Sequence, residues 1–319
     1  MTVPTTSART ARKPSWLKVR AAGGETHAWI KSLRREGGLA TVCDEARCPN
    51  LAECWSGGTA TFMVLGDTCT RGCRFCNVKT GNPRGRLDEE EPRKVADVVR
   101  RLDLSYVVLT MVDRDDLDDG GAAHVVRCVN AVKAWSQDIK VEILMGDFRA
   151  RRASLAPLAR SAAEVLAHNV ETVEDLTSRV RDSRCGYGQS LDALAILKEE
   201  APHKLTKSSI MLGLGETDQA LRRTLRDLRS VGVDILTLGQ YLRPSPRHLP
   251  VVEYVPPETF EQWKEEALAM GFLFCASAPL VRSSYKAGEM FAERWLRDRE
   301  RQEIPRGGPP ASRGEWMEV

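Results

Sequence analysis

Short runs of apolar, mostly β-branched residues alternate along the chain with segments whose apolar positions recur at the period of a helix. The first run, 59–67, predicts a buried strand, and 91–103 predicts a helix with one apolar face. The alternation continues over six strand–helix units. Further strands are predicted at 105–110, 140–145, 164–170, 205–212 and 233–239, with 272–277 as a short extra strand. Further helices are predicted at about 122–135, 155–162, 172–181, 189–200, 217–230 and 257–270.

This alternation predicts an α/β fold built from parallel βαβ units with right-handed crossovers. Nearly continuous apolar strands fit a closed or partly closed barrel with helices outside, although an open doubly wound sheet would show the same pattern. Polar residues at the predicted strand ends favour the barrel, since a barrel gathers all those ends at one mouth. These residues include Asp67, Thr110, Asn169, Lys207 and Gln240.

Composition describes an ordinary globular protein. The 319 residues are 42% hydrophobic and 29% charged, with a formal net charge of +3. So small a net charge offers no concentrated field for nucleic acid, and no apolar run reaches the roughly 18–20 residues that would span a bilayer. We therefore expect neither a nucleic-acid nor a membrane partner.

The two ends of the chain differ from its middle. Residues 1–22 are basic, lack acidic residues and are rich in Ser, Thr and Pro, which predicts a disordered tail. A mitochondrial presequence has a similar composition, although this segment is short and contains prolines. Residues 298–319 are charged and then rich in Pro and Gly, which predicts a second mobile tail. Because no apolar signal-peptide segment is evident, we expect a reducing compartment and a cytoplasmic location.

Six of the nine cysteines lie between Cys43 and Cys76. In a reducing compartment such clustered thiols more often bind metal or do chemistry than form disulfides. Directly after the first strand comes C-x3-C-x2-C, formed by Cys69, Cys73 and Cys76. Three thiolates on one short loop can hold three irons of a cubane cluster and leave the fourth iron open to a ligand. A structural zinc site normally has four protein ligands, and the fourth is missing here.

A second triad, Cys43, Cys48 and Cys54, has the different spacing C-x4-C-x5-C. Two triads of unlike spacing favour two clusters with different tasks over one or two shared zinc sites. We expect the other three cysteines to have no role in metal binding or catalysis. Cys128 and Cys275 lie in apolar segments and should be small buried hydrophobes, whereas Cys185 lies in a loop.

The C-x3-C-x2-C loop, with the aromatic Phe75 before its last cysteine, resembles that of the radical S-adenosylmethionine enzymes. More closely, the chain resembles the lipoyl synthase family from about Trp16 to Ala287. The resemblance rests on TVCDEARCPNLAECW, GTATFMVLGDTCTRGCRFCNV, VVLTMVDRDDLDDGGA, HNVETV, TKSSIMLGLGET, DILTLGQYLRPS and PLVRSSYKA. It implies a partial (β/α)6 TIM-like barrel at 59–277, with an N-terminal extension at 23–58 and a C-terminal segment at 278–297 covering the mouth.

The resemblance also implies two 4Fe–4S clusters. One, on Cys69, Cys73 and Cys76, would bind the amino and carboxylate groups of S-adenosylmethionine through its free iron. The other, an auxiliary cluster on Cys43, Cys48 and Cys54, would take a serine of Arg282-Ser283-Ser284-Tyr285 as fourth ligand, and we favour Ser284. The reaction implied is the insertion of two sulfur atoms at C6 and C8 of an octanoyl chain on a carrier lysine, with the auxiliary cluster as sulfur donor.

Residues at strand ends are candidates for cofactor contacts. In this family context Phe75 and Asn169 should reach S-adenosylmethionine, and so should the glycine-rich segment with Gly213, Gly215 and Glu216. The two glycines would allow close approach of the backbone to a ligand. Lys207 lies in an apolar strand and should not be buried without a charged partner, for which the cofactor carboxylate is one candidate.

The resemblance implies several partners. They are octanoylated carrier domains of 2-oxoacid dehydrogenase acyltransferase subunits and the glycine cleavage H protein, reduced ferredoxin or flavodoxin as electron donor, and an iron–sulfur carrier that rebuilds the auxiliary cluster. The chain should be a monomer. Two competing hypotheses are a radical methylthiotransferase acting on RNA, which would need a basic RNA-binding module, and an iron–sulfur electron carrier or zinc scaffold. The acidic run 113–119 is interpreted as a turn and helix N-terminus rather than a metal site.

Overall fold

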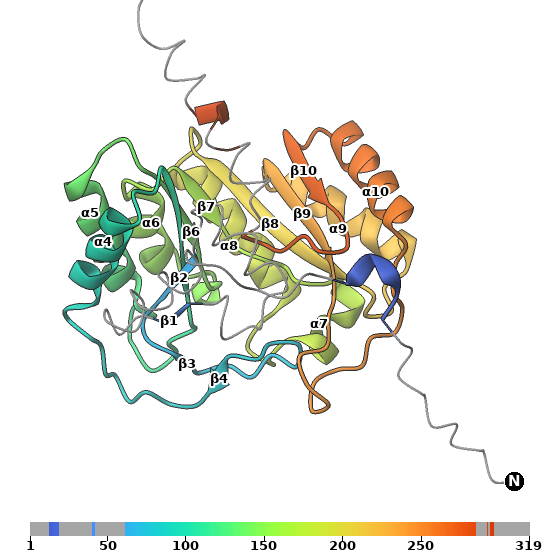
Figure 1. The fold of residues 1–319 in the computed structure, drawn as a ribbon, viewed down its shortest axis with the longest axis horizontal. Helices are drawn as coiled ribbons and strands as arrows, with labels where there is room; N and C mark the ends of the chain where they lie inside the picture. Colours follow the sequence, from blue (N-terminus) through green and yellow to red (C-terminus); the bar gives the residue numbers. More distant parts are fainter. Residues whose placement is uncertain (1–12, 19–39, 42–60, 285–291, 293, 297–319) are drawn as a thin grey trace, which may run out of the picture.

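A central sheet of eight strands organises the molecule (Figure 1). The structure, a computed structural model, describes residues 13–18, 40–41, 61–284, 292 and 294–296. The order of strands in the sheet is β1-β2-β5-β6-β7-β8-β9-β10. Their bounds are β1 Ala40–Thr41, β2 Thr61–Val64, β5 Tyr106–Met111, β6 Lys140–Leu144, β7 Val165–Ala167, β8 Leu205–Leu212, β9 Ile235–Gln240 and β10 Phe274–Ser277. All neighbours are parallel except β1, which pairs antiparallel with β2.

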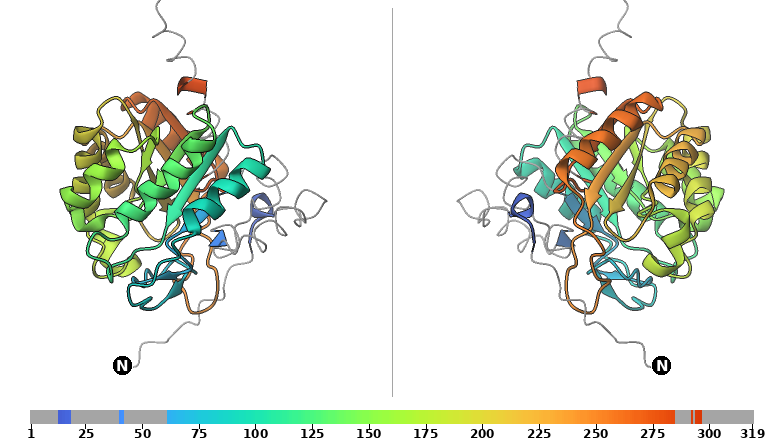
Figure 2. Two further views of the ribbon diagram at one scale, coloured as in Figure 1. Left: turned by 90° about the vertical axis from the view of Figure 1, so that its left-hand side faces the viewer. Right: turned by 90° about the vertical axis from the view of Figure 1, so that its right-hand side faces the viewer.

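Helices connect the parallel strands and cover one side of the sheet (Figure 2). They are α4 Glu91–Arg101, α5 Ala122–Trp135, α6 Arg152–Arg160, α7 Glu174–Val180, α8 Tyr187–Glu200, α9 Asp218–Ser230 and α10 Pro257–Ala269. Short 3-10 turns lie at η1 Ser15–Leu17 and η2 Phe148–Ala150. The predicted alternation is confirmed, with most boundaries within three residues. The 272–277 segment forms a seventh parallel strand, because β10 pairs with β9 in register.

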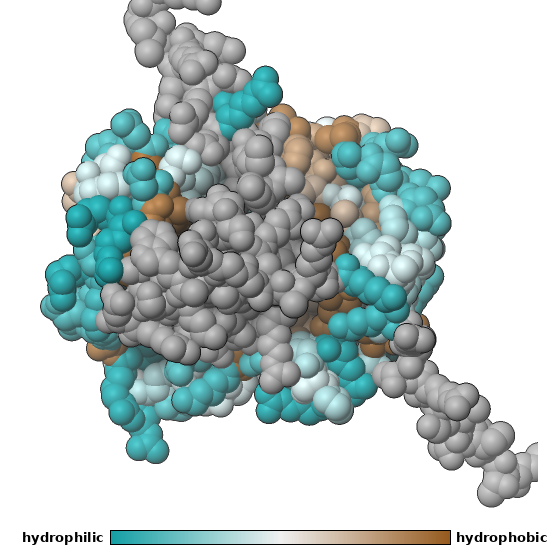
Figure 3. All heavy atoms as spheres, viewed as in Figure 1, coloured by the Kyte–Doolittle hydropathy of each residue, from teal (hydrophilic) through white to brown (hydrophobic). Residues whose placement is uncertain are grey.

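The sheet is not a closed barrel in the described part of the chain, since β1 and β10 form its two edges and do not pair. This agrees with a partial barrel. Two apolar clusters fill the space between sheet and helices. Cys128 and Cys275 belong to them and are 0% and 1% exposed, which confirms that they are buried hydrophobes. Hydrophilic residues dominate the outer edges of the face in Figure 3.

A third, smaller cluster lies on the other side of the sheet, near the first residues of the strands. Tyr106, Leu205 and Ile235 contribute to it, and Ala292 and Leu296 from the C-terminal segment pack there. Ala292 and Leu296 therefore lie near the N-terminal ends of the strands, so the prediction that segment 278–297 covers the mouth is wrong for these residues. No helix of the described residues is long and apolar enough to cross a membrane.

A two-stranded parallel sheet, β3 Thr68–Cys69 and β4 Lys79–Thr80, follows β2 and was not predicted. Strands of two residues carry no periodicity, so the pattern of apolar residues cannot reveal them. The tails 1–22 and 298–319 and the extension 23–58 lie almost wholly outside the described residues, so these boundaries stay predictions.

Candidate cluster and cofactor site

The loop between β3 and β4 carries the C-x3-C-x2-C motif. The amide of Cys76 donates to the carbonyl of Cys73 (3.1 Å), and the amide of Gly81 donates to the carbonyl of Cys69 (2.9 Å). The loop is held to the sheet by the amide of Thr70, which donates to the carbonyl of Asp113 (2.9 Å). These bonds place the three thiols on one tightly turned segment.

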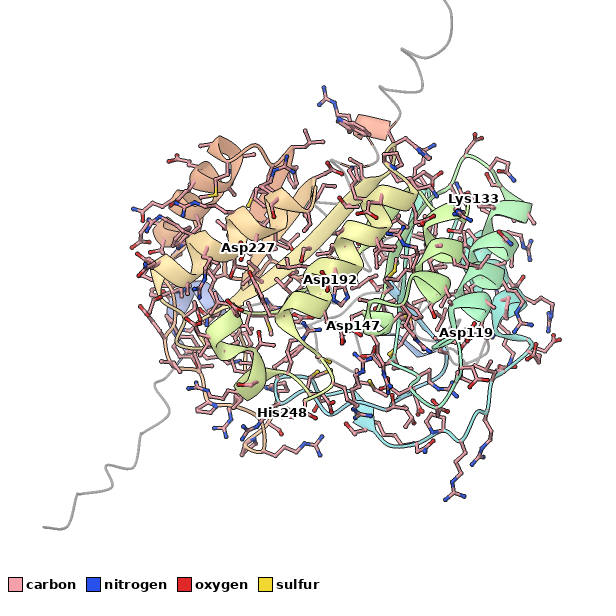
Figure 4. The ribbon with its side chains drawn as sticks, turned by 180° about the vertical axis from the view of Figure 1, so that it is seen from behind. Asp119, Lys133, Asp147, Asp192, Asp227 and His248 are labelled. Carbon is pink, nitrogen blue, oxygen red and sulfur yellow. The ribbon has the colours of Figure 1, made fainter. Side chains whose placement is uncertain are left out.

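All three thiols line a cavity of about 320 Å³ at the C-terminal ends of the strands. Residues from five strands or the turns after them reach it: Thr110, Leu144, Asn169, Ser209 and Gln240. The strand ends therefore converge as predicted for a barrel mouth. In Figure 4 His248 and Asp147 lie on the side of the molecule that carries the β3–β4 loop. A hydrogen bond joins Nε2 of His248 to the carbonyl oxygen of Cys76 (3.0 Å).

A buried arginine of the cluster loop ties this loop to neighbouring turns. Arg71, 4% exposed, donates to both oxygens of Asp115 (2.9 and 3.1 Å) and to Oδ1 of Asp147 (2.8 Å). Burial alone would raise the pKa of Asp115, yet the hydrogen bonds and charge of Arg71 lower it to about 2. The loop is thus tied by charge-assisted bonds to the turns after β5 and β6, and those bonds persist at neutral pH.

The acidic run has the structural role that was predicted. Asp115 holds Arg71, and Asp119 accepts from the amides of Gly121 and Ala123 (both 2.8 Å) at the start of α5. Carboxylates at that position meet free amides and the positive end of the helix dipole.

The environment of the thiols suits metal ligation. Burial raises the pKa of Cys69 to about 12 and that of Cys76 to about 11. The pKa of Cys73 is raised by its hydrogen bond to Cys185 and by burial. Such thiols keep their protons at neutral pH unless a cation replaces them, and iron binding releases those protons. Three thiols sharing one cavity fit a cubane cluster with one open corner.

Asn169 and Phe75, both predicted to contact the cofactor, line the cavity. The amide of Asn169 donates through Nδ2 to Oε1 of Glu171 (3.0 Å). Its Oδ1 is buried without a partner among the described residues. Nε2 of His168 is likewise unpaired within that part of the chain, while Nδ1 lies 2.9 Å from the Met145 carbonyl. Buried polar atoms without partners are rare, so these atoms are fit to bind a polar ligand.

Lys207 is not among the residues that line the cavity, and its contact with the cofactor stays a prediction. Its Nζ donates to both carboxylate oxygens of Glu142 (2.7 and 2.9 Å), and both side chains are almost fully buried. The charged partner that burial requires is therefore present in β6.

Gly213, Gly215 and Glu216 in the turn after β8 are not among the residues that line the cavity either, so their contacts with the cofactor stay predictions. Glu216 accepts from the amides of Gly213 (2.6 Å) and Leu214 (2.9 Å) and so closes the turn. Gly213 has φ +94°, and a Cβ there would collide with the carbonyl oxygen of Glu253. Gly215 also has a positive φ, and a Cβ there would meet only Val252. At Gly213 the absence of a side chain therefore permits a close approach of the protein's own backbone.

Cys185 and Arg71 line the same cavity and were missed as site residues. Cys185 was expected to have no role in metal binding or catalysis, yet Nη1 of Arg71 donates to its Sγ (3.3 Å). One signal in the sequence could have pointed to it: the loop before α8 follows the fourth parallel strand and its first helix, on the side where the strand ends converge.

The second triad, Cys43, Cys48 and Cys54, lies outside the described residues. Ser284 is described and is half-buried, whereas its neighbour Ser283 lines the cavity. The choice between these two serines stays a prediction.

A cubane-type thiol triad at the mouth of a partial α/β barrel defines a radical S-adenosylmethionine protein. The model of the radical SAM superfamily matches residues 63–228. The solved structure of Streptococcus suis SuiB bound to S-adenosylmethionine has the same fold, with a TM-score of 0.50 at 10% identity, covering 69% of this chain and 50% of that one. Membership of the radical SAM superfamily supports a 4Fe–4S cluster and S-adenosylmethionine as cofactors.

Closer relatives identify the branch of the superfamily. Mitochondrial lipoyl synthase of Kluyveromyces lactis is 53% identical over 298 residues, which cover 92% of this chain and 80% of that protein. Lipoyl synthase of Sorangium cellulosum is 54% identical over 301 residues, covering 90% and 81%. The chain belongs to the lipoyl synthase family, whose members are sulfur-inserting enzymes.

Proposed function

We propose that this chain inserts two sulfur atoms at C6 and C8 of an octanoyl group bound to a carrier lysine, giving the lipoyl group. The observation that carries the proposal is the convergence of Cys69, Cys73 and Cys76 on one cavity, which also presents buried polar atoms that have no partner among the described residues. Membership of the lipoyl synthase family supports the particular reaction.

The substrate explains why radical chemistry is required. An unactivated C–H bond has no acidic proton and no leaving group, so side-chain acids and bases cannot attack it. A cluster held by Cys69, Cys73 and Cys76, together with S-adenosylmethionine, would supply the radical chemistry that such a bond requires. The chain's own residues position and shield these groups: Arg71 fixes the cluster loop, Asn169 offers an amide oxygen, and Phe75 and Met111 give apolar walls that exclude water.

The sulfur source in this proposal is an auxiliary 4Fe–4S cluster on Cys43, Cys48, Cys54 and a serine of the RSSY segment, Ser284 or Ser283. A hard oxygen ligand binds iron less well than a thiolate does, so it could leave when the cluster is taken apart. Ser283 lines the cavity, which supports a serine of this segment lying close to the site where the octanoyl carbons would react.

The protein-bound octanoyl substrate follows from the family. We further propose the carriers named above, namely the 2-oxoacid dehydrogenase acyltransferase subunits and the glycine cleavage H protein. Reduced ferredoxin or flavodoxin would donate electrons, and an iron–sulfur carrier would rebuild the auxiliary cluster. The relatives include mitochondrial proteins and a bacterial one, so a cytoplasmic location stays a prediction, as does the monomeric state.

Two variants test the division of labour between the triads. Anaerobically reconstituted chain should carry about eight irons and use two S-adenosylmethionines per lipoyl group. Cys43→Ala should still cleave S-adenosylmethionine yet form no lipoyl group, whereas Cys69→Ala should lose both activities. Cys128→Ala, which alters a buried thiol of the α5 core, is the control and should keep both. Equal loss of cleavage in the two triad variants would contradict the proposal.

A further inference from the structure

The cluster loop, the segment between β3 and β4, carries an exposed arginine between two cysteines of its motif. Arg74 is exposed and is not among the residues that line the cavity, whereas its neighbours Cys73 and Phe75 both line it. The side chain of Arg74 therefore lies on the outer side of the loop, and the loop itself stands between this arginine and the cavity.

Three further arginines lie on segments that contact the loop at Arg74. On one side, Nη1 of Arg74 donates to the carbonyl of Arg179 (3.4 Å). On the other side, the carbonyl of Arg74 accepts from the amide of Leu249 (3.3 Å), and the segment before Leu249 carries Arg243 and Arg247. Arg179 and Arg247 are exposed, and Arg243 is half-buried. We call these four residues, Arg74, Arg179, Arg243 and Arg247, the arginine surface.

The positive charge of the arginine surface is not neutralised by carboxylates. Nη2 of Arg179 donates to the carbonyl of Leu214 (2.9 Å), and Nε of Arg243 donates to the carbonyl of His248 (2.9 Å). Within the described ranges of the chain, none of the four arginines forms an ion pair with a carboxylate. A carbonyl group is a dipole without net charge, so the surface keeps its four positive charges.

Exposed arginines of neighbouring turns show the opposite arrangement. Nη2 of Arg149 lies 2.9 Å from Oδ1 of Asp115, and Nε of Arg184 lies 2.8 Å from Oδ1 of Asp182. The carboxylate of Asp182 also accepts from the amide of Gly72 in the cluster loop (2.7 Å). Uncompensated charge is therefore a property of the surface around Arg74 and not of every arginine near the loop.

We propose that the arginine surface docks an acidic protein that delivers single electrons to a cluster held by Cys69, Cys73 and Cys76. This deepens the proposed function and rests on its first part, the presence of that cluster. One electron leaves the docked donor, which is oxidised, and enters the cluster, which is reduced, and no atom is transferred. A donor with clustered carboxylates fits this surface, because opposite charges speed association and fix the orientation of the two proteins.

The position of the surface favours an electron donor over an octanoylated carrier domain. A protein docked on the arginine surface lies against the loop that holds the cluster ligands, and electron transfer slows steeply with distance. An electron needs only to cross that loop. A carrier docked in the same place would have to bring its octanoyl-lysine past the cluster to reach the cavity.

The first test is equilibrium binding of an oxidised, negatively charged flavodoxin to the reconstituted full chain, measured by calorimetry. Arg247→Glu and Arg74→Glu should each weaken binding about fivefold at low ionic strength, and the difference should fall below about twofold at about 0.5 M salt. Arg74→Gln, which removes the charge and keeps a hydrogen-bond donor, should show a smaller loss and serves if the glutamate variant does not fold.

The matched control is Arg226→Glu, since Arg226 is also exposed but lies on α9, outside the sheet. Its binding of flavodoxin should stay within about twofold of wild type, because a charge far from the docked protein is screened by salt. Unchanged binding in Arg247→Glu and in both Arg74 variants, or an equal loss in Arg226→Glu, overturns the proposal.

A second measurement separates this proposal from the proposed function. Cleavage of S-adenosylmethionine is driven either by reduced flavodoxin or by dithionite, a small reductant that needs no docking surface. Arg247→Glu should require about fivefold more flavodoxin for the half-maximal rate, yet match wild type with dithionite. A defect seen only with an octanoylated carrier domain would assign the surface to the carrier and overturn the proposal. If the wild-type chain cleaves no S-adenosylmethionine with either reductant, the proposed function itself fails, which is distinct from a defect confined to flavodoxin.

Discussion

Lys207 and Glu142 form an ion pair in the middle of the sheet, at 1% and 0% exposure. Nζ of Lys207 lies 2.7 Å from the nearer carboxylate oxygen, and Glu142 also accepts from the hydroxyl of Tyr106 (2.8 Å). The side chains come from strands that are separated by β7 in the sheet. The ion pair therefore links β6 to β8 across β7.

The loss of folding stability on removing one partner can be worked out from this geometry. Two unit charges at this separation attract by about 6 kcal/mol at an effective dielectric constant of about 20. Desolvation of both groups opposes that attraction, so the intact pair adds little net stability. Removal of one partner leaves the other charge buried and unpaired, which costs about 3–5 kcal/mol. We therefore expect Lys207→Met to lower the midpoint of thermal unfolding by about 10 °C.

A double-mutant cycle on the cluster-free chain measures the pair. Lys207→Met and Glu142→Gln should each destabilise strongly in urea unfolding, whereas the double variant should recover at least about 2 kcal/mol, since it leaves no unpaired charge. The glutamine retains an oxygen that accepts from Tyr106. The reconstituted double variant should bind S-adenosylmethionine within twofold of wild type. The reasoning is refuted if the single variants cost under about 1 kcal/mol, or if the double variant loses cofactor binding.

Three further predictions concern the described residues. Burial lowers the pKa of His168 to about 4 from 6.5, so the neutral imidazole favours the folded state fully above pH 6.5 and less as pH falls toward 4. The free energy of unfolding, measured in urea titrations, should therefore fall by about 2 kcal/mol between pH 7 and 5. In His168→Gln this part of the pH dependence should be absent. Gly213→Ala should lower the free energy of unfolding by more than about 2 kcal/mol, because φ is positive and the new Cβ meets the Glu253 carbonyl. Gly85→Ala, with a positive φ and open space around the Cβ, should lower it by about 1 kcal/mol. Equal losses of stability in thermal unfolding would contradict the clash at Gly213. Glu91→Gln should cost about 2 kcal/mol in the same assay, because the carboxylate accepts from two backbone amides after β2 and contacts a histidine of α5, and a change below about 0.5 kcal/mol would contradict this role.

The regular part of the fold could be predicted from sequence because it depends on periodicity. Apolar runs of four to eight residues and amphipathic segments of ten or more follow directly from burial on a sheet or a helix face. The motif at Cys69, Cys73 and Cys76 could also be interpreted from the sequence, because three cysteines so close together in the chain bring their thiols together in any fold.

Contacts between distant segments could not be predicted. Whether Lys207 contacts Glu142 or a ligand depends on the order of the strands in the sheet, and nothing near Lys207 in the sequence carries that information. Cys185 looks like a lone loop thiol until the turn before α8 is docked on the cluster loop by hydrogen bonds that involve backbone groups. These bonds join segments more than 100 residues apart, and nothing next to Cys185 in the sequence shows which segment it will meet.

The central claim is that the chain transfers sulfur from its own cluster to an octanoyl group, and an isotope experiment tests it directly. The chain is reconstituted anaerobically with iron and heavy-isotope sulfide, freed of unbound sulfide, and given an octanoyl-lysyl carrier, S-adenosylmethionine and a reductant for a single turnover. Mass spectrometry of the carrier should show a lipoyl group in which both sulfur atoms are the heavy isotope. An octanoyl group that stays unchanged, or a product whose sulfur is light, would contradict the claim.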